Sequence, residues 1–152
     1  MKKITALDHI CGIHRYSTDP NLSIYAEIKR VDDFIVEEIT NDGTILSLDS
    51  PKLKPSKYVG LFTHFVLIKR NIDTLTAIRI LSRKLGVPQS YISLSGMKDK
   101  EAITVQRACV FGVDPSKIMA TKFPAAIRIL SPVRELRRLH IGDHWGNKFS
   151  IR

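Results

Sequence analysis

The sequence predicts an α+β fold, with an antiparallel or mixed sheet and packing helices. Runs that alternate apolar and polar residues, as half-buried strands do, occur within residues 22–39 and at Ile103–Phe111. Between them, Thr74–Leu85 carries apolar residues at helical spacing. A chain of 152 residues with 43% hydrophobic content is long enough to bury a core. We therefore expect a single domain over residues 1–152.

The amino-terminal part is predicted to form a small antiparallel meander. Two strands are expected within residues 22–39, one around Ile24–Ile28 and one around Phe34–Val36. Asn41-Asp42-Gly43 tolerates the positive φ of a tight turn, so Thr44–Leu48 is expected to return as a third strand. A loop marked by proline and glycine then precedes a further strand at Leu61–Lys69.

The clearest helix is Thr74–Leu85. Asp73 can accept hydrogen bonds from its first turn, and Gly86 followed by Pro88 can end it. Its polar face carries three basic side chains that are candidate contacts for RNA phosphates: Arg79, Arg83 and Lys84. The alternative is an ordinary solvated face.

The second half of the chain continues the sheet. Tyr91–Ser95 and Ile103–Phe111 are predicted strands, Asp114 is expected to cap a short helix that reaches Ala120, and Ala126–Pro132 is a further strand. A basic cluster that follows supplies more candidate phosphate contacts: Arg134, Arg137 and Arg138. The last strand-like run stops at Arg152 without a closing turn, which predicts an open sheet edge suited to self-association or to pairing with another chain.

Charge is distributed unevenly along the chain. Residues 1–50 hold 5 basic and 9 acidic side chains, whereas residues 51–152 hold 19 basic and 6 acidic ones. A basic second part favours a polyanionic partner such as RNA, because neutralised phosphates supply most of the sequence-independent affinity for nucleic acid. A solubilising surface is the alternative.

Cysteine usage and hydropathy indicate the setting. Cys11 and Cys109 lie far apart, and no apolar run resembles a signal peptide or a membrane span, so we expect a cytoplasmic protein with no membrane partner. His9, Cys11 and His14 form the only metal-like cluster in the sequence. No second pair completes four ligands, so we expect no metal and interpret these residues as ordinary structure.

The loop between the strands at Tyr91–Ser95 and Ile103–Phe111 contains Lys98-Asp99-Lys100. Such a loop can project a carboxylate into a cleft while the sheet holds its base, and flanking ammonium groups favour the ionised form. Asp99 is therefore a candidate base or nucleophile. The alternative is a solvated charged turn.

Four segments in order resemble one family. Gly96–Gln106 resembles the Gly-x-Lys-Asp-Lys-x-Ala-x-Thr-x-Gln signature of the TruD family of pseudouridine synthases. Three further segments resemble other elements of that family: Asp32–Ile39, Lys69–Thr74 and Gly146–Phe149. Together they are far more specific than one short motif. The resemblance implies the amino-terminal part of a TruD-like catalytic domain, apparently truncated, with the family's insertion domain absent.

The resemblance also implies an activity. Enzymes of this family move the ribose C1′ of a uridine from N1 to C5 of the base without cofactor or metal. The implied substrate is tRNA, with the D arm as the usual target. Asp99 resembles the essential aspartate, which acts beside the sugar as nucleophile or as base. A flipped base also needs a dry pocket.

Further site residues follow from the same resemblance. Asn147 and Phe149 are two residues apart, so on a strand they share a face and offer an amide for the uracil edge and a ring for stacking. A turn residue and a core aromatic are the alternative. Lys29 resembles a basic residue that the family places close to the active site.

The signature run itself supplies three more candidate substrate contacts: Lys98, Lys100 and Gln106. Gln106 and Thr104 are also expected to share a strand face, from which their side chains could orient the Asp99 loop by hydrogen bonds. An ordinary polar strand face is equally compatible with the pattern.

Two other functions stay open. A non-catalytic RNA-binding module would use the same basic half and Phe149 but would not need Asp99. A subunit of a split enzyme would be active only with a partner that supplies the missing carboxy-terminal half.

Overall fold

The computed structural model describes residues 5–15, 27–49, 52–54 and 60–152. The predicted strand around Ile24–Ile28 lies mostly outside the described residues, and Ile28 itself belongs to a segment without regular structure. Pro51 and Pro55 of the predicted loop also lie outside them.

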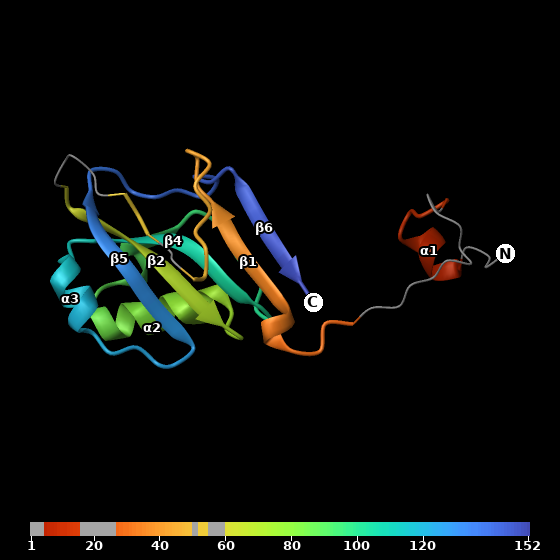
Figure 1. Ribbon diagram of the computed structural model, residues 1–152, viewed down its shortest axis with the longest axis horizontal. Coiled ribbons are helices and arrows are strands. Elements are labelled where there is room, and N and C mark those ends of the chain that lie inside the picture. The colour runs from red at the N-terminus through yellow and green to blue at the C-terminus, as the bar shows by residue number, and fades with distance from the viewer. Residues whose placement is uncertain (1–4, 16–26, 50–51, 55–59) are drawn as a thin grey trace.

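A six-stranded mixed sheet forms the body of the protein (Figure 1). Its order is β5 (Ile127–Glu135), β2 (Phe62–Arg70), β4 (Ile103–Phe111), β1 (Phe34–Ile39) and β6 (Gly146–Ile151). β3 (Ile92–Leu94) pairs with the second half of β4, while β1 pairs with its first half. Only β1 and β4 run parallel; the other pairs are antiparallel. The predicted α+β class with a mixed sheet is confirmed.

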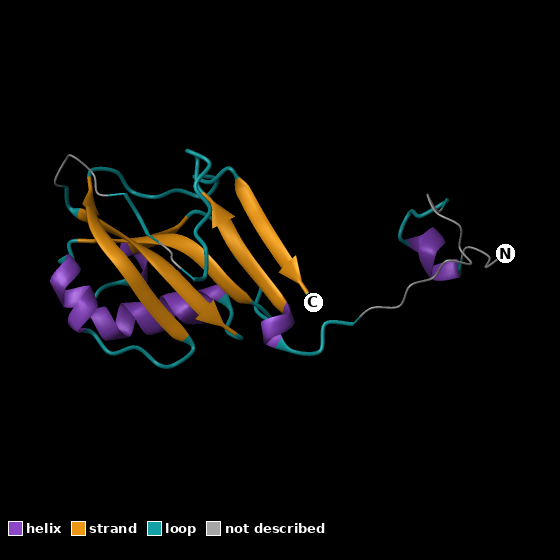
Figure 2. Cartoon of the chain, viewed as in Figure 1, coloured by secondary structure: helices purple, strands orange, loops and turns teal. Residues whose placement is uncertain are grey.

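Two helices cover one face of this sheet, as Figure 2 shows. α2 (Thr74–Leu85) spans the residues predicted for it. Asp73 accepts a hydrogen bond from the Thr76 amide at 2.8 Å, and Gly86 ends the helix with φ 71°. α3 (Pro115–Ala120) starts at the predicted cap, Asp114. The helices and strands bury one apolar cluster between them, which includes Phe65, Leu67, Leu81, Leu85, Val110 and Ile118.

The segment after β1 covers the opposite face instead of extending the sheet. Leu46 is 1% exposed and packs with Val66, Ile68 and Val105. The backbone of this segment pairs with β1 at a single bridge, Ile39–Ile45, and the Leu48 amide donates to the Glu37 side chain at 2.7 Å. The predicted strand Thr44–Leu48 and the antiparallel meander are therefore wrong. β6 pairs along one edge of β1, and β4 pairs with Ile35–Glu37 on the other edge, so only the end of that second edge is left for the returning chain, where the Leu46 amide donates to the Glu38 carbonyl.

β5 continues past its predicted end, through Pro132, to Glu135. Proline is tolerated because β5 is an edge strand and because the pairing with β2 slips at this point. Between the pairs Val66–Leu130 and His64–Val133, two residues of β5 stand against one of β2, which is a bulge, and Ser131 there has φ 49°.

Short helical elements complete the described chain. α1 (Ala6–Ile10) is capped by a reciprocal pair of bonds between Thr5 and Asp8, buries no residue, and lies apart from the sheet in Figure 1. Two single 3₁₀ turns follow: Val31–Asp33 immediately precedes β1, and Gln89–Tyr91 immediately precedes β3. No helix in the described part of the chain is long and apolar enough to cross a membrane.

Candidate active site

Buried side chains hold the backbone of the loop that carries Asp99, residues 95–102 between β3 and β4. Thr74, at the start of α2, accepts from the Lys98 amide at 3.2 Å and donates to the Lys98 carbonyl at 3.1 Å. Gln106 on β4 donates its amide to the Gly96 carbonyl at 3.2 Å. Both Thr74 and Gln106 are buried, whereas Asp99 is exposed. The loop is therefore fixed from beneath while its carboxylate faces outward.

A lysine adds a third support. Lys69 lies near the end of β2, is fully buried, and donates from Nζ to the carbonyl oxygen of Asp99. Burial lowers the pKa of its ammonium to about 8, although the nearby carboxylates of Asp99 and Asp73 favour the charged form. The sequence patterns indicated Lys69 only indirectly, because alternation along β2 places it on the buried face with Phe65 and Leu67.

Lys98 does not stand beside the Asp99 carboxylate at the surface. Its side chain is 3% exposed, and Nζ lies 3.6 Å from an oxygen of Glu38. Glu38, itself 0% exposed, also pairs with Arg107 at 3.1 Å and accepts a hydrogen bond from the Ser95 hydroxyl. This buried ion cluster ties β1, β4 and the Asp99 loop together. A contact between Lys98 and substrate stays a prediction.

A cavity of about 500 Å³ opens beside Asp99. Three predicted site residues line it: Asp99, Lys29 and Lys100. The rest of the lining consists of Ile28, Arg30, Val31, Phe34, Asn71 and Glu101. None of the ion pairs among the described residues uses Asp99, Lys29 or Lys100. Their charges are thus available to a ligand in this cavity.

Two further ion pairs fix the segment that leads into β1 at this cavity. Arg70 binds Asp32 through both guanidinium nitrogens, with Nη2 2.6 Å from Oδ2, and this hydrogen bonding lowers the pKa of Asp32. Arg30 binds Asp33 in the same two-pronged way, at 3.0 and 3.2 Å, and lowers the pKa of that carboxyl. Both contacts hold Phe34 and Lys29 next to the Asp99 loop.

Asn147 and Phe149 share one face of β6, as their spacing predicts. Phe149 lies opposite Val36, is 56% exposed, and stacks on Phe34 with 6.1 Å between ring centres and 14° between planes. Phe34 also lines the cavity beside Asp99, so the ring pair extends its wall. Asn147 lies opposite Glu38, and its side-chain oxygen is buried without a hydrogen-bond partner among the described residues.

The predicted phosphate contacts divide into two groups. Arg79, Arg83 and Lys84 are all exposed on α2, with no ion pair among the described residues. By contrast, Arg134 pairs with Asp114 at 3.0 Å, and Arg138 bonds Ser93 and Ser90 at 2.5 and 2.8 Å. The arginines expected to form one cluster after the predicted strand Ala126–Pro132 are therefore partly engaged within the protein.

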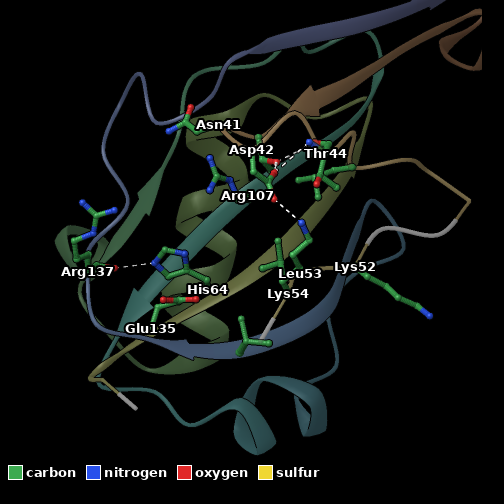
Figure 3. A pocket seen from close by; sticks show the side chains of 13 residues that line it. Asn41, Asp42, Thr44, Lys52, Leu53, Lys54, His64, Arg107, Glu135 and Arg137 are labelled. Carbon is green, nitrogen blue, oxygen red and sulfur yellow. Dashed lines mark hydrogen bonds and ion pairs between the residues drawn. The ribbon is translucent and has the colours of Figure 1, made fainter. Parts of the chain in front are cut away.

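A second cavity, of about 290 Å³, lies on the sheet face opposite the helices (Figure 3). His64 bonds the Arg137 carbonyl at 2.8 Å, and burial lowers the pKa of this imidazole. Asp42 accepts from Thr40, from the Thr44 amide and from Lys54, and these bonds, led by the one from Lys54, lower its pKa. Of the predicted site residues, the lining includes only Arg137.

Metal ligands were not expected, and within the described ranges no group of three or more His, Cys, Asp or Glu side chains could hold an ion. His9 and His14 contact each other as tilted rings 5.5 Å apart near α1.

Comparison with known proteins gives concordant matches. A family described as TruD, tRNA pseudouridine synthase D, matches residues 11–152. "Probable tRNA pseudouridine synthase D 1" of Methanocaldococcus jannaschii is 39% identical over 82% of this chain and 32% of its own length. A Methanosarcina barkeri relative, "Probable tRNA pseudouridine synthase D", is 32% identical over 98% of this chain and 31% of its own length.

A solved structure agrees with these matches. The crystal structure of the TruD protein of Methanosarcina mazei superposes with a TM-score of 0.67 at 35% identity, over 80% of this chain and 25% of that one. The chain thus spans about a third of the length of the curated relatives that it matches.

Proposed function

The chain belongs to the TruD family of tRNA pseudouridine synthases, and we propose that it supplies the catalytic aspartate and part of the uridine pocket for converting uridine to pseudouridine in tRNA. One observation carries this proposal. Asp99 presents a free carboxylate to a cavity of about 500 Å³, on a loop whose backbone is held by buried side chains. Rigid support of an exposed reactive group is what a catalytic site requires.

The reaction asks for little beyond this carboxylate. The bond from N1 to C1′ breaks and C1′ joins C5. The hydrogen on C5 leaves as a proton and N1 takes up a proton, so atoms and electrons balance without a cofactor. The ionised Asp99 either attacks C1′ or removes a ribose proton. Both routes start from a carboxylate oxygen that is free to approach the sugar.

The rings beside Asp99 suit a uracil that has been turned out of its stack. Phe149 is more than half exposed, and its stacking on Phe34 fixes the orientation of its ring. A base can stack on such a ring, and the side chain of Asn147 can hydrogen-bond the edge of the base. Lys29 and Lys100 line the same cavity as Asp99, and we propose that they contact the sugar–phosphate backbone of the flipped nucleotide.

The rest of the tRNA is proposed to follow the exposed basic residues of α2, with the D arm as the target and the cytoplasm as the setting. Exposed, unpaired cations release condensed counterions when they bind phosphate, which makes such contacts favourable and dependent on salt. Arg79, Arg83 and Lys84 meet this description.

A partner chain or segment is proposed at β6. In the described part of the chain, β6 pairs only with β1, so its outer edge carries unpaired backbone groups. A further strand can pair there, either from the remainder of a longer enzyme or from a second copy of this chain. If that strand completes the pocket, the chain acts as a subunit of a split enzyme.

The direct test is tritium release from tRNA labelled at uridine C5, because joining C1′ to C5 expels that hydrogen. Asp99→Asn should abolish release while tRNA binding persists or strengthens, since a negative charge is lost. Asp49→Asn is the matched control, because Asp49 is an exposed carboxylate on the opposite face of the sheet. Equal release by Asp99→Asn and wild type would contradict the proposal.

A second arm covers a chain that is inactive alone. The chain is spliced in place of the matching third of the Methanocaldococcus jannaschii relative, and release is measured again with and without Asp99→Asn. Release that appears only in the chimera identifies a subunit of a larger catalytic unit. Salt-sensitive tRNA binding without release in either arm identifies a non-catalytic RNA-binding module.

A further inference from the structure

Lys69 is a buried cation at the centre of the sheet. It lies opposite Thr104 of β4 on one side and Ile127 of β5 on the other, and its relative exposure is 0%. Its side chain points to the helix-covered face, where Phe65 and Leu67 of the same strand pack into the apolar cluster. An ammonium group in such a place needs a reason, because burying a charge is costly.

No carboxylate lies within ion-pair distance of Lys69 among the described residues. Three charged groups act on it from a greater distance: Asp99 and Asp73 favour its charge, and Lys98 opposes it. Its one described hydrogen bond goes to the Asp99 carbonyl. Lys69 is thus fixed to the peptide of the reactive residue and to no neutralising partner in the described chain.

Stability alone does not account for a lysine here. A methionine has nearly the same length and shape, is apolar, and would fill the same space without a desolvation penalty. Replacing buried ionic groups with well-packed apolar ones is often neutral or stabilising. A residue that costs stability and touches the catalytic loop is expected to serve the site.

We propose that Lys69 is a positioning residue, whose buried ammonium holds the Asp99 peptide so that the Asp99 carboxylate projects into the cavity in its reactive orientation. The inference rests on the proposed function, because it takes Asp99 as the reactive group. Thr74 and Gln106 fix the loop on the amino-terminal side of Asp99, at Lys98 and Gly96, and Lys69 fixes Asp99 itself.

The test compares Lys69→Met with Leu67→Met, a change on the same strand and the same buried face at a side chain that packs in the apolar cluster and has no polar group to bond the loop. Lys69→Met should unfold at the same or a higher urea concentration than wild type at pH 7. Its amide hydrogens at Asp99 and Lys100 should exchange at least about tenfold faster. Tritium release should fall about 10²-fold, the usual cost of misplacing a reactive group. Leu67→Met should leave loop exchange and release unchanged.

The dependence of tritium release on pH gives a second measurement, which a purely structural role of Lys69 would leave unchanged. In the wild type, release should decline as pH rises through about 8, where Lys69 loses its charge and its hydrogen bond to Asp99 weakens. Lys69→Met should lack this decline. A Lys69→Met protein that fails to fold, or that keeps wild-type loop exchange and release, would overturn the proposal.

Failure of the inference can be told from failure of the proposed function. If wild type and Asp99→Asn both release no tritium in the chain and in the chimera, the function fails, whereas faster loop exchange in Lys69→Met would still show that Lys69 holds the loop. If wild type is active and Lys69→Met is equally active with the same pH profile, the function stands and the inference is wrong.

Discussion

Two cavities in the described part of the chain differ in which of their charged residues are paired. At the cavity of Figure 3, Asp42 is matched with Lys54 at 2.7 Å, and Arg107 is matched with Glu38. At the Asp99 cavity, Asp99, Lys29 and Lys100 have no ion-pair partner among the described residues, and buried groups bind the backbone of the loop instead. Paired charges stabilise a fold, whereas unpaired charges on a held backbone are available for a substrate.

The largest loss of stability is expected for Glu38→Gln, which breaks the paired charges. Removing this carboxylate leaves Lys98 and Arg107 buried without their counter-charge, so the free energy of unfolding should fall by about 3–5 kcal/mol. Urea denaturation at pH 7 measures it. Glu37→Gln is the matched control: its partner Lys148 is half-exposed, so it should cost only about 1 kcal/mol. Equal losses in the free energy of unfolding for the two variants would show that the buried ion cluster around Glu38 adds no extra stability.

The second effect is a dependence of the free energy of unfolding on pH that arises from Lys69. The pKa of this lysine is 10.5 for an ordinary side chain and about 8 in the folded protein. Between these values the unfolded chain binds more protons than the folded one, so stability should rise from pH 8 to 10.5, by about 3 kcal/mol at most. The difference between wild type and Lys69→Met in urea denaturation at each pH isolates the increment. A constant difference would contradict burial of a charged lysine.

A smaller effect is expected at the ring pair. Phe149→Ala removes the exposed ring on which a uracil is proposed to stack, and base–aromatic stacking contributes about 1–3 kcal/mol per base. The KM for tRNA should rise by roughly tenfold or more, with little loss of fold stability because the ring is 56% exposed. Steady-state tritium release measures it. A large fall in the urea midpoint with an unchanged KM would assign Phe149 to packing.

The smallest effect is expected in the salt dependence of tRNA binding, where exposed cations without an ion pair should contribute more than paired ones. Replacing Arg79 and Arg83 together with alanine should make the dependence of log K for tRNA binding on log salt shallower by about 1–2. Arg134→Ala should change this slope less, because Asp114 already neutralises that arginine. Binding titrations at several salt concentrations give the slopes. Equal slopes for all variants would exclude α2 as a phosphate-binding surface.

Local signals explain which parts of the fold the sequence could predict. α2 begins and ends where predicted because Asp73 and Gly86 act within the helix's own turns. β4 was equally clear from its long run of strand-forming residues. The strand predicted at Thr44–Leu48 does not form because strand pairing is not local: β4, from a distant part of the chain, pairs with Ile35–Glu37 on the edge of β1 that the returning chain would need.

The site shows the same limit. Asp99 stands out because its neighbours match a family signature, and the shared face of Asn147 and Phe149 follows from strand geometry. Lys98 and Lys69 could not be assigned in this way. Loop sequence does not tell which of the two lysines that flank Asp99 turns inward, and no pattern shows that a lysine on β2 reaches a carbonyl 30 residues away.

One experiment tests the contrast between the cavities most directly: tritium release and urea unfolding measured on Asp99→Asn and Asp42→Asn, one carboxylate from each. Asp99→Asn should lose release by at least about 10³-fold and keep its urea midpoint, since its side chain has no ion pair among the described residues. Asp42→Asn should keep release and unfold at lower urea, because its bonds to Thr40, Thr44 and Lys54 weaken. Release that survives in Asp99→Asn, or is lost in Asp42→Asn, would contradict this account of the protein.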